Sequence, residues 1–225
     1  MPQFTIQYGR DGGTREPDGR LDAPAFHRNV EPIWSVLGPF LAGRAGHVLE
    51  AGSGTGQHAV TYAARTPDIV WRPSDANPAH LASIEAWRRY AGLANVRPPL
   101  LLDLAEPGWR VAEEEVCEAG GFLAFFCANV LHIAPWRVAE GLFDGAGRQL
   151  RPDGRLFVYG PFMRDGRHTA PSNAQFDASH RRENPEWGVR DIADLDRLAV
   201  RAGLRLRETA DMPANNVVLV FERSA

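Results

Sequence analysis

The sequence predicts an α/β fold, a doubly wound sheet of seven mostly parallel strands with helices on both faces. Short apolar segments alternate along the chain with segments whose apolar residues recur at helical spacing, which is the pattern of parallel strands joined by crossover helices. The last two predicted strands are joined only by residues 211–216, whereas a parallel crossover needs about a dozen residues. We therefore expect these two strands to form an antiparallel hairpin at the edge of the sheet.

The first half of the chain begins with a polar segment and continues as alternating strands and helices. Residues 1–27 contain glycines and prolines and are predicted to form an N-terminal arm or lid, whereas residues 28–225 are predicted to form a single domain. Asn29 is a suitable N-cap for the first helix, and Asn77 followed by Pro78 indicates the start of another. The elements predicted in this half are helices at residues 29–42, 56–65 and 78–91 and strands at residues 47–50, 69–72 and 100–102.

The second half continues the alternation and ends in the hairpin. The fourth strand is wholly apolar, as expected for a strand buried on both faces. A turn at residues 151–154 precedes the fifth strand, and a long loop at residues 160–173 follows it. Gly203 ends the last helix. The elements predicted here are strands at residues 122–127, 155–159, 204–210 and 217–223 and helices at residues 136–150, 172–184 and 192–202.

The composition argues against several classes of protein. The chain has 225 residues, a net charge of −3 and a pI near 6.2, and a general nucleic-acid-binding protein would need an excess of basic residues. All 25 basic residues are arginine, so Schiff-base enzymes and P-loop nucleotidases are excluded. Cys117 and Cys127 form no CxxC pair and suit a reducing, cytoplasmic compartment. We expect no membrane span and no metal site, because no apolar run reaches about 18 residues and the histidines are scattered.

The clearest functional motif is a glycine-rich turn between the first predicted strand and the following helix. It reads Glu-Ala-Gly-Ser-Gly-Thr-Gly over residues 50–56, at the carboxyl edge of the strand, where open α/β sheets bind ligands. Glycine lets a ligand approach the backbone closely. A dinucleotide-binding GxGxxG motif starting at Gly52 would require glycine at position 57, which is Gln57. The spacing therefore disfavours a nicotinamide oxidoreductase.

Two further acids end the next two predicted strands. Asp75 lies 19 residues after Gly56, where a carboxylate can accept both hydroxyls of a ribose. Asp103 ends the third strand, where its side chain or the backbone of Leu104 can meet an adenine amino group. Each acid could instead cap a helix or a turn. Acids at three successive strand ends nevertheless favour a ligand that contains a nucleoside.

With this turn and these acids, the chain resembles class I S-adenosylmethionine-dependent methyltransferases over residues 45–223. The resemblance implies a Rossmann-like fold whose glycine turn holds the methionine part of S-adenosyl-L-methionine, with Asp75 at the ribose and Asp103 at the adenine. Glu50 would support the methionine part through water or through its amino group, and S-adenosyl-L-homocysteine would be the product. Arg28 could bind a carboxylate of the cofactor or the substrate, or stay a solvated charge. The cofactor residues are then Arg28, Glu50, Gly52, Ser53, Gly54, Gly56, Gln57, Asp75, Asp103, Leu104 and Asn129.

A closer resemblance covers nearly the whole chain after its first 20 or so residues. Segments in the same order are similar to the family whose animal member is methyltransferase-like protein 26, which is assigned to a domain of unknown function. This resemblance implies the fold and the cofactor better than it implies the substrate. The segments are residues 28–33, 52–59, 129–136, 159–162, 165–166, 172–173, 176–177, 187–188 and 212–216.

His132 is the candidate catalytic residue. Methyl transfer from a sulfonium is an in-line displacement, in which an enzyme mainly supplies proximity and alignment. An acceptor that still carries its proton is helped by a general base, and His132 follows the fourth strand at the same edge as Asn129. His132 could instead cap the following helix or bond to the backbone, and many methyltransferases need no base.

Polar and aromatic residues after the fifth strand and in the last hairpin are candidates for contact with the acceptor. The loop at residues 160–177 should lie over the reactive end of the cofactor, and the connection between the last two strands emerges at the same edge. Tyr159 and Trp187 could equally be core residues, and Asn215 and Asn216 could simply form a turn. The candidates are Tyr159, Phe162, His168, Asn173, Asp177, Trp187, Asn215 and Asn216.

Together these features predict a cytoplasmic methyltransferase that acts on a small molecule, without a nucleic-acid or membrane partner and with its oligomeric state open. One alternative is methylation of a protein or RNA. The Asn/Asp-Pro-Pro-aromatic motif of adenine and cytosine methylases is absent, because residues 128–131 read Ala-Asn-Val-Leu. The other alternative is an S-adenosylmethionine-binding protein without catalysis, against which the long polar loop argues mildly.

Overall fold

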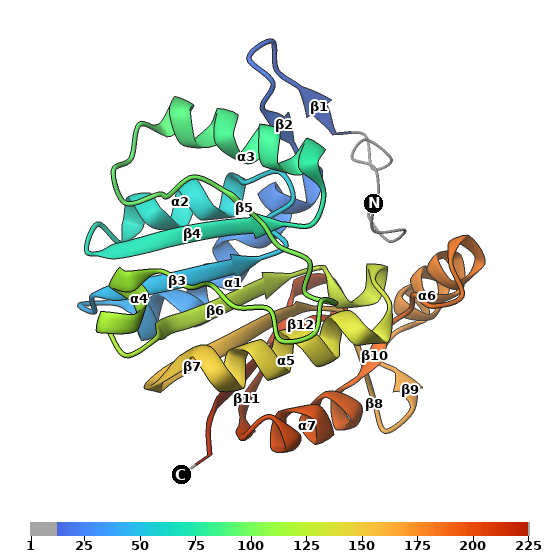
Figure 1. Ribbon diagram of the computed structural model, residues 1–225. Helices are drawn as coiled ribbons and strands as arrows, with labels where there is room; N and C mark the ends of the chain where they lie inside the picture. The colour runs from blue at the N-terminus through green and yellow to red at the C-terminus, as the bar shows by residue number, and fades with distance from the viewer. Residues whose placement is uncertain (1–12, 225) are drawn as a thin grey trace.

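A seven-stranded sheet forms the centre of the molecule in the computed structural model, which describes residues 13–224 (Figure 1). The strand order is β11-β12-β7-β6-β3-β4-β5, and only β12 runs antiparallel to its neighbours. This confirms the predicted α/β fold with an antiparallel hairpin at one edge. The strands are β3 (Gly46–Ala51), β4 (Ile69–Asp75), β5 (Leu100–Leu101), β6 (Phe122–Ala128), β7 (Leu150–Gly160), β11 (Leu204–Met212) and β12 (Asn216–Arg223).

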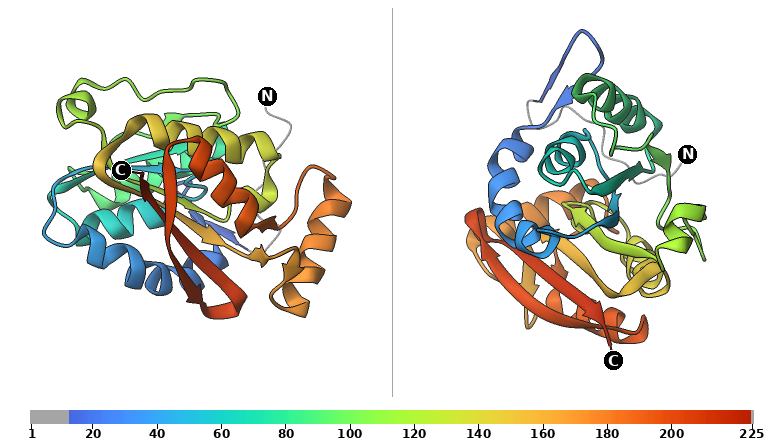
Figure 2. Two further views of the ribbon diagram at one scale, coloured as in Figure 1. Left: turned by 90° about the horizontal axis from the view of Figure 1, so that it is seen from below. Right: turned by 90° about the vertical axis from the view of Figure 1, so that its left-hand side faces the viewer.

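Helices cover both faces of the sheet, as Figure 2 shows. One apolar core lies between the sheet and the first two helices, and the other lies between the sheet and the helices around α5 and α7. Short 3-10 turns, η1 (Leu131–Ile133) and η2 (Pro213–Asn215), follow β6 and β11. The α-helices are α1 (Pro24–Leu41), α2 (Gln57–Arg65), α3 (Pro78–Ala91), α4 (Glu114–Glu118), α5 (Trp136–Gln149), α6 (Pro171–Glu183) and α7 (Ile192–Arg201).

The alternation of side chains along the central strands explains why both cores form. In β6, Phe125 and Cys127 pack into the core under α5, whereas Phe126 between them packs against α1 and α2. Because a strand directs successive side chains to opposite faces, a wholly apolar strand must be covered on both sides. The helices α1 and α2 on one face of the sheet and α5 on the other provide that cover.

The first helix begins at Pro24, five residues before the predicted start. Asn29 is therefore not an N-cap. It lies inside the helix and is buried, and its Oδ1 accepts a hydrogen bond of 2.8 Å from the hydroxyl of Tyr159 in β7. The tyrosine thus pins α1 to the sheet. The periodicity of the apolar residues did not reveal the first turn, because that turn begins with Pro-Ala-Phe and has no side-chain cap.

Two segments predicted to be irregular contain strands instead. The predicted turn at residues 151–154 is a bulged start of β7, since the ladder with β6 shifts register between Phe122 and Ala124. The predicted long loop contains β8 (Phe162–Arg164) and β9 (Arg167–His168), which form an antiparallel hairpin. A short strand before α7, β10 (Arg190–Asp191), pairs with β8 and makes a second, three-stranded sheet.

The N-terminal segment also carries a hairpin. β1 (Thr14–Arg15) and β2 (Leu21–Asp22) pair antiparallel and lie beside α3 (Figures 1 and 2). The first twelve residues of the predicted arm are outside the described part of the chain. Within residues 13–224, none of the helices is both long and apolar enough to cross a membrane.

We expect Tyr159→Phe to lower the free energy of unfolding by about 1–3 kcal/mol, because the buried Oδ1 of Asn29 would lose its donor. Urea denaturation measures the change. Tyr90→Phe is the matched control, since Tyr90 is 66% exposed, and it should stay within about 0.5 kcal/mol of the parent. Equal stability of the Tyr159 variant and the control would show that this hydrogen bond does not stabilise the fold.

Candidate functional site

The glycine-rich turn between β3 and α2 has a backbone that only glycine adopts without strain. The φ angles of Gly52, Gly54 and Gly56 are +75°, +56° and +92°. A Cβ on Gly52 would lie 2.5 Å from Val130 Cγ2, so the turn also packs closely against the segment after β6. A Cβ on Gly54 would meet nothing within 4 Å. The middle of the turn therefore faces open space, whereas its first glycine is packed against the protein.

Hydrogen bonds to the end of β4 hold this turn. The N–H groups of Gly52 and Ser53 both donate to the carbonyl of Ser74, at 3.0 and 2.8 Å. The hydroxyl of Ser74 in turn donates to the carbonyl of Glu50 at 2.8 Å. These hydrogen bonds fix the turn to the neighbouring strand, β4.

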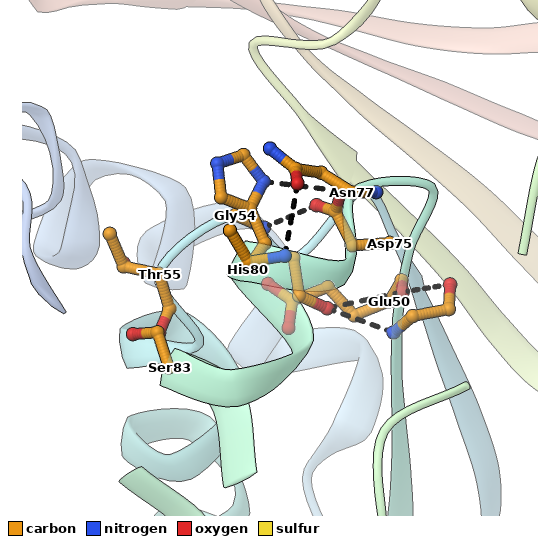
Figure 3. Close-up of polar contacts among 10 residues, drawn as sticks. Glu50, Gly54, Thr55, Asp75, Asn77, His80 and Ser83 are labelled. Carbon is orange, nitrogen blue, oxygen red and sulfur yellow. Dashed lines mark hydrogen bonds and ion pairs between the residues drawn. The ribbon is translucent and has the colours of Figure 1, made fainter. Parts of the chain in front are cut away.

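Asp75, the last residue of β4, contacts the turn directly (Figure 3). Its Oδ2 accepts the N–H of Gly54 at 2.9 Å, and its Oδ1 accepts the N–H of Asn77 at 2.8 Å. His80 Nδ1, from the first turn of α3, lies 3.1 Å from the same Oδ1. Asp75 is 7% exposed, and its Oδ2, which accepts one N–H, keeps a second acceptor position. The part played by His80 was not predicted, because nothing local in the sequence indicates that its ring turns back toward β4.

Glu50 is a buried carboxyl directly before the turn. It is 2% exposed, and its Oε2 has no hydrogen-bond partner among the described residues. Burial raises the pKa of Glu50 from 4.5 to about 8, and the nearby charge of Asp75 adds to that rise, while contacts with Ser53 and with the N–H of Ala59 oppose it. The side chain is therefore mostly protonated near neutral pH.

The other residues predicted to bind a cofactor lie at the same edge of the sheet or close to it. Asp103 lies two residues after β5 and accepts the N–H of Ala105 at 2.8 Å, so it takes the turn-capping role that the sequence left open. Leu104 is buried against α5. Asn129 has a φ of +58°, and its N–H donates to the carbonyl of Tyr159.

Two predicted cofactor residues come from helices. Arg28 is exposed on α1. Burial raises the pKa of Tyr159 to about 12, and a hydrogen bond from Asn216 and the charge of Arg28 oppose this rise. Gln57 is 2% exposed, and its side chain forms hydrogen bonds with Asp22 and Ala23 in the N-terminal segment.

His132 lies in η1 beneath α6 and is 5% exposed. Its ring makes edge contacts with Phe176 at 5.1 Å and with His180 at 6.1 Å between centroids. Burial, together with the charges of His180 and Arg190, lowers its pKa from 6.5 to about 3. The imidazole is therefore neutral at physiological pH, and it is enclosed by side chains of α6.

The residues predicted to contact an acceptor form two groups. The first group joins α6 to the tip of the last hairpin and to β9: Asn173 Nδ2 donates to the carbonyl of Asn215 at 2.9 Å, and His168 Nε2 lies 3.4 Å from Asp177 Oδ2. Asn216 is near the hairpin tip, where its Nδ2 is 3.4 Å from the carbonyl of Pro213.

The second group belongs to the interior. Phe162 is 1% exposed in the core under α5, and Tyr159 donates to Asn29. Trp187 is buried beside His180, and its Nε1 has no partner among the described residues. Over that part of the chain, no three His, Cys, Asp or Glu side chains are grouped so that they could hold a metal ion.

A family model described as "Protein of unknown function (DUF938)" matches residues 20–223. The match spans most of the described chain, from the N-terminal hairpin to the last strand.

Solved methyltransferase structures share the fold. An O-methyltransferase family protein from Burkholderia thailandensis has a TM-score of 0.72 and 19% identity, over 89% of this chain and 57% of that one. S-adenosylmethionine-dependent methyltransferase SibL has a TM-score of 0.64 and 23% identity, over 89% and 58%. CalO1, a methyltransferase in calicheamicin biosynthesis solved with S-adenosylhomocysteine, has a TM-score of 0.63 and 17% identity, over 80% and 49%. The chain thus spans about half of each of these proteins, and at these identities the likeness shows the Rossmann-like fold alone.

The burial of Glu50 predicts a pH dependence of stability. Between pH 4.5 and about 8 the unfolded chain has released the proton that the folded protein keeps, so stability falls as the pH rises through this interval. Glu50→Gln removes the titration. The free energy of unfolding of the variant should exceed that of the parent by a few kcal/mol at pH 8.5, because each pKa unit is worth about 1.4 kcal/mol. The difference between the two proteins should shrink toward pH 4.5.

Urea midpoints from pH 4.5 to 9 measure this effect. Glu106→Gln changes an exposed glutamate and should follow the parent at every pH. If the stability of the Glu50 variant fell as steeply with rising pH as that of the parent, the pH dependence would belong to another group.

Proposed function

The chain belongs to the DUF938 family, described as proteins of unknown function, and from this premise we propose that it is an S-adenosylmethionine-dependent methyltransferase that transfers a methyl group to a small-molecule acceptor. The observation that carries the proposal is the acidic GxGxG turn, whose middle glycine faces open space while its N–H is held by Asp75. We also propose that the chain is closely related to the family of methyltransferase-like protein 26. We further propose that residues 1–27 form an arm and that residues 28–225 form a single domain.

The chemical groups at the turn fit the parts of S-adenosylmethionine. The unpaired Oε2 of Glu50 can accept a hydrogen bond from the ammonium of the methionine part, and Asp75, whose Oδ2 keeps an acceptor position, suits the ribose hydroxyls. Gly54 leaves room for the ligand to approach the backbone. The remaining proposed contacts come from Arg28, Gly52, Ser53, Gly56, Gln57, Asp103, Leu104 and Asn129.

The chain contributes mainly by positioning. When bound, S-adenosylmethionine supplies an electrophilic methyl group on a sulfonium. The turn and Asp75 would hold the cofactor in place. An acceptor held in line with the cofactor's methyl group then needs little further help, since alignment alone can supply much of the rate enhancement. The segments that would hold the acceptor are α6, the β8–β9 hairpin and η2, which Asn173 and Asp177 tie together.

We propose His132 as the general base for an acceptor that still carries a proton. Its pKa of about 3 keeps the imidazole in the neutral form, which can accept a proton, but it also makes the imidazole a weak base. Its contribution should therefore lie at the lower end of the range for general base catalysis. The substrate residues proposed with it are Tyr159, Phe162, His168, Asn173, Asp177, Trp187, Asn215 and Asn216.

Calorimetry with S-adenosylhomocysteine and with NAD tests the cofactor assignment. The parent should bind S-adenosylhomocysteine at micromolar level and should not bind NAD. Asp75→Ala removes a charged acceptor and should weaken binding by about 1.5–3 kcal/mol, or roughly 10- to 150-fold. Asp68→Ala removes the same charge next to the opposite end of β4 and should bind like the parent. Tighter binding of NAD, or full affinity in a folded Asp75 variant, would overturn the assignment.

Methyl transfer to a panel of small hydroxyl, amine and thiol acceptors tests the reaction. With an acceptor found in this way, His132→Gln should lower turnover about 10²-fold, while the affinity for S-adenosylhomocysteine stays within twofold. His58→Gln is the matched control, because it replaces a second, half-buried histidine that packs against Phe126 in the core. Full turnover in the His132 variant would leave alignment as the only catalytic principle, and S-adenosylmethionine binding without transfer to any acceptor would favour a binding protein.

A further inference from the structure

We propose that Gln57 and Ser83 are positioning residues, through which the N-terminal segment at residues 21–23 holds the glycine turn in its ligand-binding shape. This inference rests on the proposed function, because it concerns the turn to which the cofactor is assigned. We call residues 21–23 the strap; they comprise β2 and the residue before α1. The same polar atoms of Gln57 and Ser83 bind both the strap and the turn.

Ser83 forms the first connection. Its hydroxyl accepts the N–H of Leu21 in the strap at 2.9 Å and donates to the carbonyl of Thr55 in the turn at 2.8 Å. Figure 3 shows Ser83 on α3 facing Thr55. The serine has no exposed surface, so water cannot replace either partner. A single buried hydroxyl thus joins the two segments.

Gln57 forms the second connection, from the first residue of α2. Its Oε1 accepts both the N–H of Ala23 at 2.8 Å and the hydroxyl of Thr55 at 2.9 Å. Its Nε2 donates to Asp22 Oδ1 at 2.5 Å. Thr55 is therefore held at its carbonyl by Ser83 and at its hydroxyl by Gln57. Because Thr55 lies between Gly54 and Gly56, these contacts act at the centre of the turn.

Further contacts keep the strap in place. Trp87 Nε1 on α3 donates to the carbonyl of Leu21 at 2.8 Å. The guanidinium of Arg20 lies over the rings of Trp87 and Tyr90, at 4.7 and 3.5 Å from their centroids. The backbone N–H and C=O of Leu21 are thereby both bound to α3. The strap is docked by its main chain and by Asp22, and its position is transmitted to a turn that has three glycines with positive φ.

Asp22→Ala tests the proposal from the side of the strap, because it removes the acceptor of Gln57 Nε2 while every residue of the turn keeps its identity. We expect the Kd for S-adenosylhomocysteine to rise about tenfold, which corresponds to about 1.4 kcal/mol. Hydrogen exchange of a peptide covering residues 52–57, measured without ligand, should also become faster. Asp22→Asn keeps an oxygen acceptor and should restore both quantities. Asp18→Ala breaks only a pair inside the hairpin and should match the parent.

Two further variants separate this role from its alternatives. His27 Nε2 lies 2.7 Å from Asp22 Oδ1, and His27→Ala should leave both readouts unchanged if the coupling runs through Gln57. Combined with Ser83→Ala, Asp22→Ala should show a non-additive loss of affinity, as expected for side chains that act on one turn. Parent-like affinity and exchange in a folded Asp22→Ala variant would overturn the proposal. If the parent bound no S-adenosylhomocysteine, the proposed function would fail, while exchange of the turn would still decide whether the strap holds it.

Discussion

The hydrogen bond between the N–H of Gly54 and the carboxylate of Asp75 is the contact on which the candidate site depends. The ladder between β3 and β4 pairs Ala51 with Ser74, so Asp75 extends one residue beyond the last pair and reaches the turn. The same carboxylate accepts the N–H of Asn77, the residue that caps α3. One side chain therefore fixes the turn, the end of β4 and the start of α3 relative to one another.

The fold could be predicted because its signals are local. The apolar run of β6, the glycines of the turn and the pair Asn77-Pro78 each act within a few residues, and the structure has a strand, a turn and a helix start there. The placement of Asp75 follows from the alternation of strands and helices. Its role toward a ribose, like the roles of the other candidate residues, stays a proposal.

The contacts that the sequence did not reveal join residues far apart in the chain. Asn29 suits an N-cap by its type, but its partner is Tyr159, and Gln57 is engaged by residues 34 and 35 positions earlier. In the predicted loop after β7, β8 also pairs with β10, which comes more than twenty residues later. The burial of His132 likewise depends on Phe176 and His180. Side-chain type and spacing contain no information about such partners, which the packed fold alone determines.

The position of β12 has a consequence for the order in which the protein is assembled during synthesis. β12 lies between β7 and β11, and β11 has no other neighbour in the sheet. Until residues 216–223 have left the ribosome, β7 keeps an unpaired edge beside the apolar side chains of both cores. Such an edge can pair with other chains, so the interval before β12 inserts is when the nascent protein is most exposed to misassociation.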